Sequence, residues 1–468
     1  MNYLITLLNK QEEKIRMIQE ISTKFNSFEL YTIFKDDSFS FILDSGMDAN
    51  RLGRYSFISS DPFKIIKIYK NSTNPFDILK EELNKYKIKN STHLPFIGGA
   101  VGYLSYDLCR FIERIPDSAI DDINIPLLYL GLYNWVIVVD HLENRTYIAT
   151  PDIDKELENI AVTKVLERIK NAQLSGIDSI YYQNKEYPEV ILKSNFTKKE
   201  YLQSVEKIRD YIRSGDVYQV NLTQRFEGKV MATGYEIYKD LRMVSPAPFG
   251  AYLNFEEVEI LSNSPERFIK VKDRVVETRP IKGTRPRGKT HEEDLRLREE
   301  LLNSEKDKAE LLMIVDLERN DIGKVAKIGS VKVPELFKLE EYSNVHHLVS
   351  TVVGELDEGK DLVDLIKAVF PGGSITGAPK VRAMEIIDEL EPNQRNIYTG
   401  CIGYLGFDGS VDLNIAIRTI VKKGDCVYFQ VGGGITWDSN PYDEYEETLH
   451  KAKSIIKALR GQYEEKSN

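Results

Sequence analysis

The sequence predicts a fold in which β-strands and α-helices are mixed along the chain without a strict βαβ rhythm. Residues 29–148 alternate β-branched and aromatic residues with turn clusters such as Asp61-Pro62, which is typical of a sheet-rich unit. From residue 196 onward, apolar strand-like runs mix with strong amphipathic helices. A chain of 468 residues is too long for one simple core, so we expect two or three structural units.

In the first half helices intervene between the strands, for example at 75–86, and a charged helical stretch follows at 154–172. The apolar run at 127–139 is interrupted by Gly131 and Asn134 and is shorter than the roughly 20 residues that span a bilayer, so it predicts buried strand. The polar segment 173–195 is predicted to connect two domains. We therefore divide the chain into a sheet-rich N-terminal domain at 1–172, a connection at 173–195 and a second domain at 196–462.

The second domain begins with a helix whose N-terminus can be predicted from the sequence. Thr197 and Glu200 form a capping-box pattern, and Gly215 stands where a C-terminal cap belongs. A strand follows at 217–226. One of its faces carries only polar residues, and this pattern favours exposure to solvent over a place in a site: Gln219, Asn221, Thr223 and Arg225.

Composition limits the classes of function. Lys and Arg number 63 against 73 Asp and Glu, giving a net charge of −10, so a general binder of nucleic acid or anionic membranes is not expected. An acidic substrate must then be held by local cations. The three cysteines fit no C-x-x-C pattern, and the apolar stretch Leu4 to Leu8 runs into charged residues and lacks the form of an export signal. We expect a cytoplasmic protein.

Two acidic positions stand out on helices. Glu310 interrupts the almost wholly apolar run 309–317, where an ionised carboxylate must be paired with a cation or must ligate a metal. The last long helix begins at Asn440-Pro441, and Glu444 and Glu447 lie one turn apart near its start. They suit a solvated helix N-terminus, or, if this face borders a cleft, a hard cation shared with Glu310.

Three further segments carry candidate chemistry. The basic run 279–288 is rich in Pro and Gly, and its Lys282 lies among apolar residues, where a lysine can lose its proton and act as a nucleophile. Glu266 follows a strand and is a candidate acid. The loop 371–380 has the glycine interval of a P-loop without its Lys-Ser/Thr, so it favours anion binding by backbone N–H groups or a plain helix start.

Taken together and in order, these pieces closely resemble the chorismate-utilising enzymes, the family that includes anthranilate synthase component I and aminodeoxychorismate synthase component I. The motifs that carry the resemblance are Ser264-Pro-Glu-Arg267, the run 279–288, Asp316-Leu-Glu-Arg-Asn-Asp321, His347-Leu-Val-Ser350, Gly377-Ala-Pro-Lys-Val-Arg382, Ile417-Arg418 and Gly432-Gly-Gly434. The resemblance implies an α+β fold like that of anthranilate synthase component I, with large antiparallel sheets packed face to face, helices outside, a central cleft and two domains interleaved in space.

The resemblance also assigns roles by motif position. A Mg²⁺ ion would be ligated by Glu310 and Glu447, with Glu444 and Asp307 assisting. Lys282 and Glu266 would be catalytic. Residues that would bind substrate or complete its pocket are Gln219, Gly283, Thr284, His347, Ser374, Tyr404, Arg418, Gly432, Gly434 and Lys451.

Two positions distinguish members of the family. Members that add water to chorismate carry a lysine base where this chain has Gln219, so a neutral side chain favours ammonia. Anthranilate synthases usually read Pro-Ile-Ala-Gly-Thr, whereas Lys282 resembles the members that aminate C4 to give 4-amino-4-deoxychorismate for 4-aminobenzoate and folate synthesis. Anthranilate synthesis, by C2 amination and pyruvate elimination, is the alternative.

No Gly-x-Cys-x-Gly element surrounds any cysteine, so a separate glutamine amidotransferase is the expected partner and ammonia source. Members of the family can bind tryptophan in the N-terminal unit. Leu43-Asp-Ser45 departs from the Leu-Leu-Glu-Ser form of feedback-regulated anthranilate synthases, which argues against inhibition by tryptophan here.

Overall fold

The computed structural model describes residues 17–45, 52–177, 187–342 and 345–465, and the stretch Leu4 to Leu8 lies outside them. Its α-helices are α2 (Ser27–Thr32), α3 (Pro75–Lys85), α4 (Lys155–Ser175), α6 (Lys198–Arg213), α7 (Gly234–Val244), α8 (His291–Asn303), α9 (Glu305–Gly323), α10 (Leu362–Val369), α11 (Lys380–Leu390) and α12 (Pro441–Ala458). Short 3₁₀ helices occur at η1 (Tyr106–Phe111) and η2 (Gly373–Ile375).

The first sheet contains thirteen strands over the described residues. In spatial order they are β1 (Ile18–Ile21), β8 (Arg145–Ala149), β7 (Val136–Asp140), β3 (Tyr55–Ser59), β2 (Ser40–Asp44), β11 (Phe249–Phe255), β12 (Val258–Ser264), β21 (Thr419–Lys423), β22 (Cys426–Ile435), β10 (Gln219–Lys229), β9 (Val190–Ser194) and β23 (Gly461–Tyr463), with β18 (Gly377–Ala378) beside β10. Its pairings are antiparallel except β23 with β9.

The second sheet contains ten strands over the same residues. Their order is β15 (Ile281–Pro286), β17 (Val345–Glu355), β14 (Val275–Thr278), β13 (Arg267–Lys272), β20 (Val411–Ile415), β19 (Cys401–Gly406), β5 (Gly99–Leu104), β6 (Leu128–Tyr133) and β4 (Lys64–Ile68), with β16 (Lys332–Glu341) beside β17. Both sheets combine strands from the two halves of the chain. The predicted α+β fold with large antiparallel sheets is therefore observed, and the two halves are interleaved.

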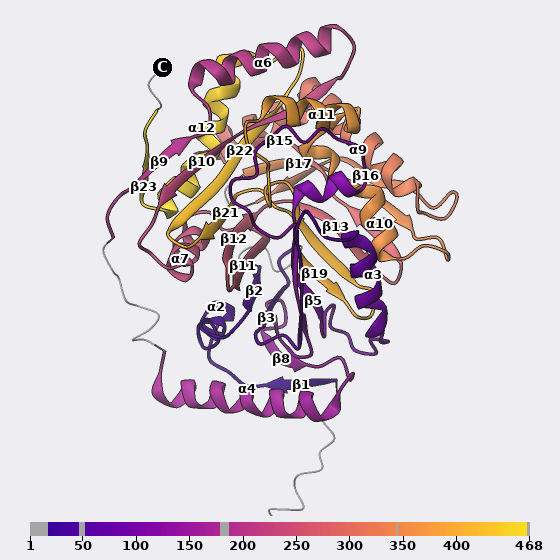
Figure 1. The fold of residues 1–468 in the computed structure, drawn as a ribbon, viewed down its shortest axis with the longest axis vertical. Coiled ribbons are helices and arrows are strands. Elements are labelled where there is room, and N and C mark those ends of the chain that lie inside the picture. The colour runs from indigo at the N-terminus through magenta and orange to yellow at the C-terminus, as the bar shows by residue number, and fades with distance from the viewer. Residues whose placement is uncertain (1–16, 46–51, 178–186, 343–344, 466–468) are drawn as a thin grey trace, which may run out of the picture.

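Successive side chains of a strand point to opposite faces of the sheet, so each strand contributes to two hydrophobic cores. Along β5, Val101 and Tyr103 pack in the aromatic-rich core shared by the two sheets, whereas Ala100 and Leu104 face the core beneath helices α3, α9 and α10. The outer face of the first sheet is covered by α2, α4, α7 and α12. Figure 1 shows α4 along one end of the molecule beside β1 and β8, and α6 at the opposite end.

Local signals in the sequence located several elements well. Helix α6 has the predicted capping box, in which the Glu200 N–H donates to Thr197 Oγ1 at 3.2 Å and the Thr197 N–H donates to Glu200 Oε2 at 2.8 Å. The predicted helix at the chain end is α12, capped by Asn440. The segment read as a connection contains strand β9, which pairs with β10. None of the described helices has both the length and the apolar content that crossing a bilayer requires.

The prediction that the polar face of strand β10 meets solvent is wrong. Gln219, Asn221, Thr223 and Arg225 are all buried. Their partners come from segments that cover this face: the Thr223 N–H and Oγ1 donate to Glu391 at 3.0 and 2.9 Å, and Arg225 pairs with Asp122. Hydrogen bonds that the sequence pattern does not reveal thus offset much of the cost of burying this face, while Gln219 Oε1 and Arg225 Nε have no partner among the described residues.

A buried ion pair between Arg395 and Glu391 links the segment after α11 to strand β10 and to the loop that contains η2. The Arg395 guanidinium, 2% exposed, pairs with Glu391 at 2.7 Å and donates to the carbonyls of Asn221 at 2.6 Å and Ile375 at 2.9 Å. Burial of both charges is tolerated because every contact is charge-assisted. This ion pair therefore holds β10 against the loop that contains η2.

Replacing Glu391 by Gln should lower the free energy of unfolding by about 3–5 kcal/mol, because it leaves the Arg395 charge buried and unpaired. Denaturant unfolding measures the change. The matched control is Asp210→Asn, which breaks an exposed pair with Arg213 and should cost less than about 1 kcal/mol. Equal effects of the two substitutions would contradict the role given to the buried pair.

Candidate active site

A cavity of about 560 Å³ lies where β15 and β17 of the second sheet approach β22 of the first, with α9 and α12 completing its wall. This volume is in the range of small-molecule sites. The cavity brings together fourteen of the sixteen residues predicted from the sequence: Glu266, Lys282, Gly283, Thr284, Asp307, Glu310, His347, Ser374, Arg418, Gly432, Gly434, Glu444, Glu447 and Lys451. Two predicted residues, Tyr404 and Gln219, do not line it.

Strand β15 and helix α9 meet at Gly283. This glycine has φ of 75°, and the pairing of β15 with β17 shifts register between Lys282 and Thr284. A Cβ at Gly283 would lie 2.8 Å from the Asp307 side chain, so only glycine allows this approach. The close packing places Lys282 on the cavity wall opposite the carboxylates of α9.

Lys282 lies between two acids. Its amine is 4.0 Å from a Glu310 oxygen, and its charge also acts on Glu266. Burial raises the pKa of Glu266 to about 7, while a hydrogen bond from Ser374 Oγ at 2.9 Å and the Lys282 charge act in the opposite direction. Glu266 is therefore a carboxyl group that holds a proton near neutral pH, as a general acid requires.

Helix α12 presents the second acidic group. Glu444 Oε2 and Glu447 Oε1 lie 3.2 and 3.6 Å from the point where a Cβ of Gly433 would stand, so both carboxylates converge on this glycine. Burial raises the pKa of Glu444. Burial also opposes ionisation of Glu447, but the Lys451 ammonium 2.7 Å away outweighs it and leaves the Glu447 pKa below its usual value. Lys451 also donates to the Gly432 carbonyl at 2.8 Å.

The donors of this cluster suit a hard cation, because carboxylate oxygens are the ligands that Mg²⁺ takes in proteins. Among the described residues, however, no three potential ligands surround a single point. Glu310 stands near Lys282, Glu447 near Lys451, and Asp307 accepts from Arg285 at 3.3 Å. The residues thus fit a cation that draws part of its coordination from water or substrate.

The cavity also contains a positively charged side chain, Arg418, that suits an anionic ligand. Arg418 makes no ion pair with any described residue, and burial lowers its pKa. Burial, with Arg418 next in effect, lowers the pKa of His347 to about 4, so this imidazole is neutral. Its Nδ1 lies 2.9 Å from Thr284 Oγ1. A carboxylate that reaches Arg418 would therefore meet an uncompensated positive charge.

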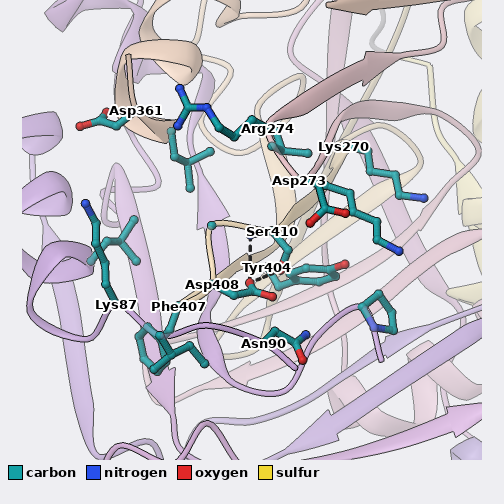
Figure 2. Close-up of a pocket in the computed structure, with 18 of the residues that line it drawn as sticks. Lys87, Asn90, Lys270, Asp273, Arg274, Asp361, Tyr404, Phe407, Asp408 and Ser410 are labelled. Atoms are coloured by element: carbon teal, nitrogen blue, oxygen red, sulfur yellow. Dashed lines mark hydrogen bonds between the residues drawn. The ribbon is translucent and has the colours of Figure 1, made fainter. Parts of the chain in front are cut away.

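The prediction that Tyr404 lines the substrate pocket is wrong. Tyr404 is 4% exposed and stacks on Phe96 with ring centroids 4.4 Å apart, in the aromatic core between the sheets. Figure 2 shows it on the wall of a different cavity, of about 600 Å³, together with Lys87 and Lys270, which stand on opposite sides and do not converge. The tyrosine that lines the active cavity is Tyr398, six residues earlier. Tyr398 lies in the turn before β19 and Tyr404 within that strand, a difference that the local sequence does not reveal.

Gln219 is absent from the cavity lining, although Asn221 on the same face of β10 lines it. The Gln219 Nε2 is 2.2 Å from where a Cβ of Gly434 would stand, and its Oε1 is buried without a hydrogen-bond partner among the described residues. The amide therefore lies beside Gly434, next to the cavity, which is a correction to its predicted place in the pocket.

The cavity contains residues that the sequence reasoning missed, including Lys306, Asn221 and Gln430. Lys306 adjoins the predicted Asp307 at the start of α9, and its charge acts on Glu444 and Glu447. Asn221 and Gln430 were visible as polar residues on strands. Only their burial beside the glycines of β22 indicates a site.

Comparisons with known proteins show the family to which the chain belongs. A family model described as chorismate binding enzyme matches residues 39–457. Anthranilate synthase component 1 of Aquifex aeolicus is 39% identical over 97% of this chain and 98% of its own length. Aminodeoxychorismate synthase component 1 of Bacillus subtilis is 41% identical over 90% and 92%. The crystal structure of anthranilate synthase component I from Streptococcus pneumoniae matches with a TM-score of 0.77 and 33% identity, covering 86% of this chain and 92% of that one. Overall similarity does not separate the two named activities.

Gly283→Ala should destabilise the protein by at least about 1 kcal/mol more than Gly329→Ala, because it adds steric overlap with Asp307 to the cost of a left-handed backbone. Gly329 is the matched control, since its φ is 77° and a Cβ there would meet no described atom within 4 Å. Denaturant unfolding of both variants gives the difference. Equal losses would show that β15 and α9 do not depend on this close approach.

Proposed function

Because the chain belongs to the chorismate-binding enzyme family, we propose that it aminates chorismate at C4 to give 4-amino-4-deoxychorismate. The observation that carries this proposal is the position of Lys282, whose amine faces the cavity between Glu310 and the buried acid Glu266. A lysine at this point can serve as a nucleophile. Similarity to anthranilate synthases keeps C2 amination as the alternative product.

The proposed chemistry uses two displacements. The free Lys282 amine adds at C2, the two ring double bonds shift from C1=C2 and C5=C6 to C1=C6 and C4=C5, and the C4 hydroxyl leaves as water after taking a proton from Glu266. Ammonia then adds at C4, both double bonds shift back, and the Lys282 amine leaves from C2. The Glu266 carboxylate recovers a proton from the added ammonia. The net reaction converts chorismate and ammonia to the C4 amine and water, and configuration at C4 is retained when ammonia adds to the ring face that the hydroxyl left.

The remaining cations and amides would hold the two carboxylates of chorismate. Arg418 lacks an ion-pair partner in the described part of the chain, and it lines the cavity beside the glycine strand of β22. Lys451 shares its charge between Glu447 and the Gly432 carbonyl and could turn to an anion at modest cost. These local charges let a protein of net charge −10 bind a dianion.

Ammonia is the proposed nucleophile, supplied by a separate glutamine amidotransferase. Gln219 supports this choice because, at the position where water-adding members carry a lysine base, this chain has a neutral amide buried beside Gly434. The relatives named component 1 imply a second component.

We also propose that Mg²⁺ binds in the cavity, held by Glu310 and Glu447 with Glu444 close by. The ion would offset the charge of the substrate and fix one of its carboxylates. The convergence of Glu444 and Glu447 on Gly433 supports this position.

Tryptophan is not expected to regulate the enzyme. Leu43, Asp44 and Ser45 line a separate cavity of about 370 Å³. Within it, the Asp44 carboxylate is already paired with Arg242 and accepts from Ser27 Oγ and Ser56 Oγ, each at 3.2 Å. A ligand amino group would have to compete with these partners.

The product formed from chorismate, MgCl₂ and an ammonium salt tests the reaction. The purified chain should form the C4 amine, detected by mass spectrometry or by conversion to 4-aminobenzoate with an added lyase. Glutamine should support no reaction until a glutaminase subunit is added. Fluorescent anthranilate formed without a lyase would establish the alternative, and no consumption of chorismate at high ammonium would overturn both.

Binding calorimetry tests the metal site without relying on turnover. In the presence of chorismate, Glu447→Gln should weaken Mg²⁺ binding at least about tenfold, the loss that even outer partners of a metal site produce. Glu446→Gln is the control, because Glu446 is the neighbouring carboxylate on α12 and pairs with Lys198 outside the cavity. Unchanged Mg²⁺ affinity in Glu447→Gln would remove Glu447 from the site.

A further inference from the structure

Helix α9 contains a second pair of carboxylates outside the cavity. Glu318 and Asp321 are 4% and 2% exposed and lie two to three turns beyond Glu310. Glu318 contacts the segment 369–374, which brings Ser374 to the cavity wall, and Asp321 is linked to the same segment through Lys380. Glu318 is not used by the chemistry described above, and a buried carboxylate needs a reason to be retained.

The contacts of Glu318 connect it to the catalytic acid. The Gly373 N–H donates to Glu318 Oε1 at 3.3 Å, and the next residue, Ser374, donates from Oγ to Glu266 Oε1 at 2.9 Å. A Cβ at Gly373 would lie 2.7 Å from Leu317, so the turn packs directly on α9.

The other end of the turn is anchored by Lys380. Its ammonium pairs with Asp321 and donates to the carbonyls of Pro371 at 2.8 Å and Val369 at 3.0 Å. Lys380 thus fixes the turn at residues 369 and 371, and Glu318 accepts the Gly373 N–H directly before Ser374. On the far side of Ser374, Asn221 and Arg395 donate to the Ile375 carbonyl.

We propose that Glu318 is a positioning residue, which accepts the Gly373 N–H and thereby holds Ser374 in place to orient the Glu266 carboxyl. Loss of the acceptor would leave a buried N–H unsatisfied, at a cost of about 1–3 kcal/mol that a shift of the turn can relieve. Such a shift would move Ser374 away from Glu266. The inference rests on the proposed function for its kinetic test and on geometry alone for its structural test.

Glu318 can act on Glu266 through its negative charge or by holding Ser374, and these two roles predict opposite shifts of the Glu266 pKa when Glu318 is replaced. Burial raises the pKa of Glu318 to about 7; Lys380 from α11 lowers it, and Asp321 and Glu266 raise it. Glu266 in turn is faced by Lys282 from β15 and by Ser374. If Glu318 acts by its negative charge, removing that charge lowers the pKa of Glu266. If it acts by holding Ser374, removing the acceptor raises that pKa, because the Ser374 hydrogen bond stabilises the carboxylate.

Two variants separate these effects. Glu318→Asp keeps the charge and withdraws the acceptor by one methylene, and Glu318→Gln keeps an acceptor and removes the charge. The measurement is the pH profile of chorismate consumption with ammonium. Glu266 must be protonated to act as the acid, so its contribution to the rate is lost as pH rises through its pKa and forms the alkaline limb of the profile.

For Glu318→Asp we expect kcat to fall about tenfold or more with KM nearly unchanged, as displacement of a catalytic group produces, and the alkaline limb to move to higher pH. Glu318→Gln should keep kcat within about threefold without an upward shift. Wild-type kinetics in Glu318→Asp, or an equal loss of kcat in both variants, would overturn the proposal.

Crystal structures of the two variants give a readout that does not need turnover. The Ser374 Oγ to Glu266 Oε1 contact should persist in Glu318→Gln and open beyond hydrogen-bonding distance in Glu318→Asp. Glu318→Met, of similar length without an oxygen acceptor, replaces Glu318→Asp if that variant fails to fold. An intact contact in the variant without an acceptor would overturn the positioning role. A wild-type chain that consumes no chorismate would instead overturn the proposed function.

Discussion

The close packing of β15 against α9 at Gly283 is the constraint on which the site depends. With φ of 75° and the Asp307 side chain where a Cβ would stand, this glycine brings a strand of the second sheet into contact with the helix that carries Glu310. Lys282 is thereby held 4.0 Å from the Glu310 carboxylate. The two side chains would be farther apart if the strand and helix were separated by an ordinary side chain.

The same cavity brings together charged side chains whose burial would cost free energy if each stood alone. Glu447 and Lys451 form an ion pair, Lys282 stands beside Glu310, and Arg418 has no carboxylate partner among the described residues. An anionic substrate and a hard cation together would exchange these contacts for new ones with little change in net charge. This arrangement accounts for how an acidic protein can bind a dianion at one place on its surface.

Sequence reasoning was most successful where chemistry and spacing act locally. The capping box at Thr197 and Glu200 located α6, and the combined motifs indicated the fold and fourteen of the residues that line the cavity. It failed where three-dimensional packing decides. Tyr398 and Tyr404 lie six residues apart in similar surroundings of the sequence, and only the structure shows which one reaches the cavity.

Burial of polar residues was the other source of error. The polar face of β10 resembles a solvent-exposed strand until Glu391, Arg395 and Asp122 are seen to cover it. Glu318 likewise lies in a charged motif that indicates nothing about its contact with Gly373. These partners are far apart in the sequence, so a local pattern contains no information about them.

The most direct test of the central claim is the rate at which Lys282→Ala converts chorismate to 4-amino-4-deoxychorismate at saturating ammonium and Mg²⁺, with chorismate binding measured on the same preparation. Covalent participation of this lysine predicts that the C4 amine disappears while chorismate affinity is largely retained. Continued formation of the C4 amine at the wild-type rate would contradict the account.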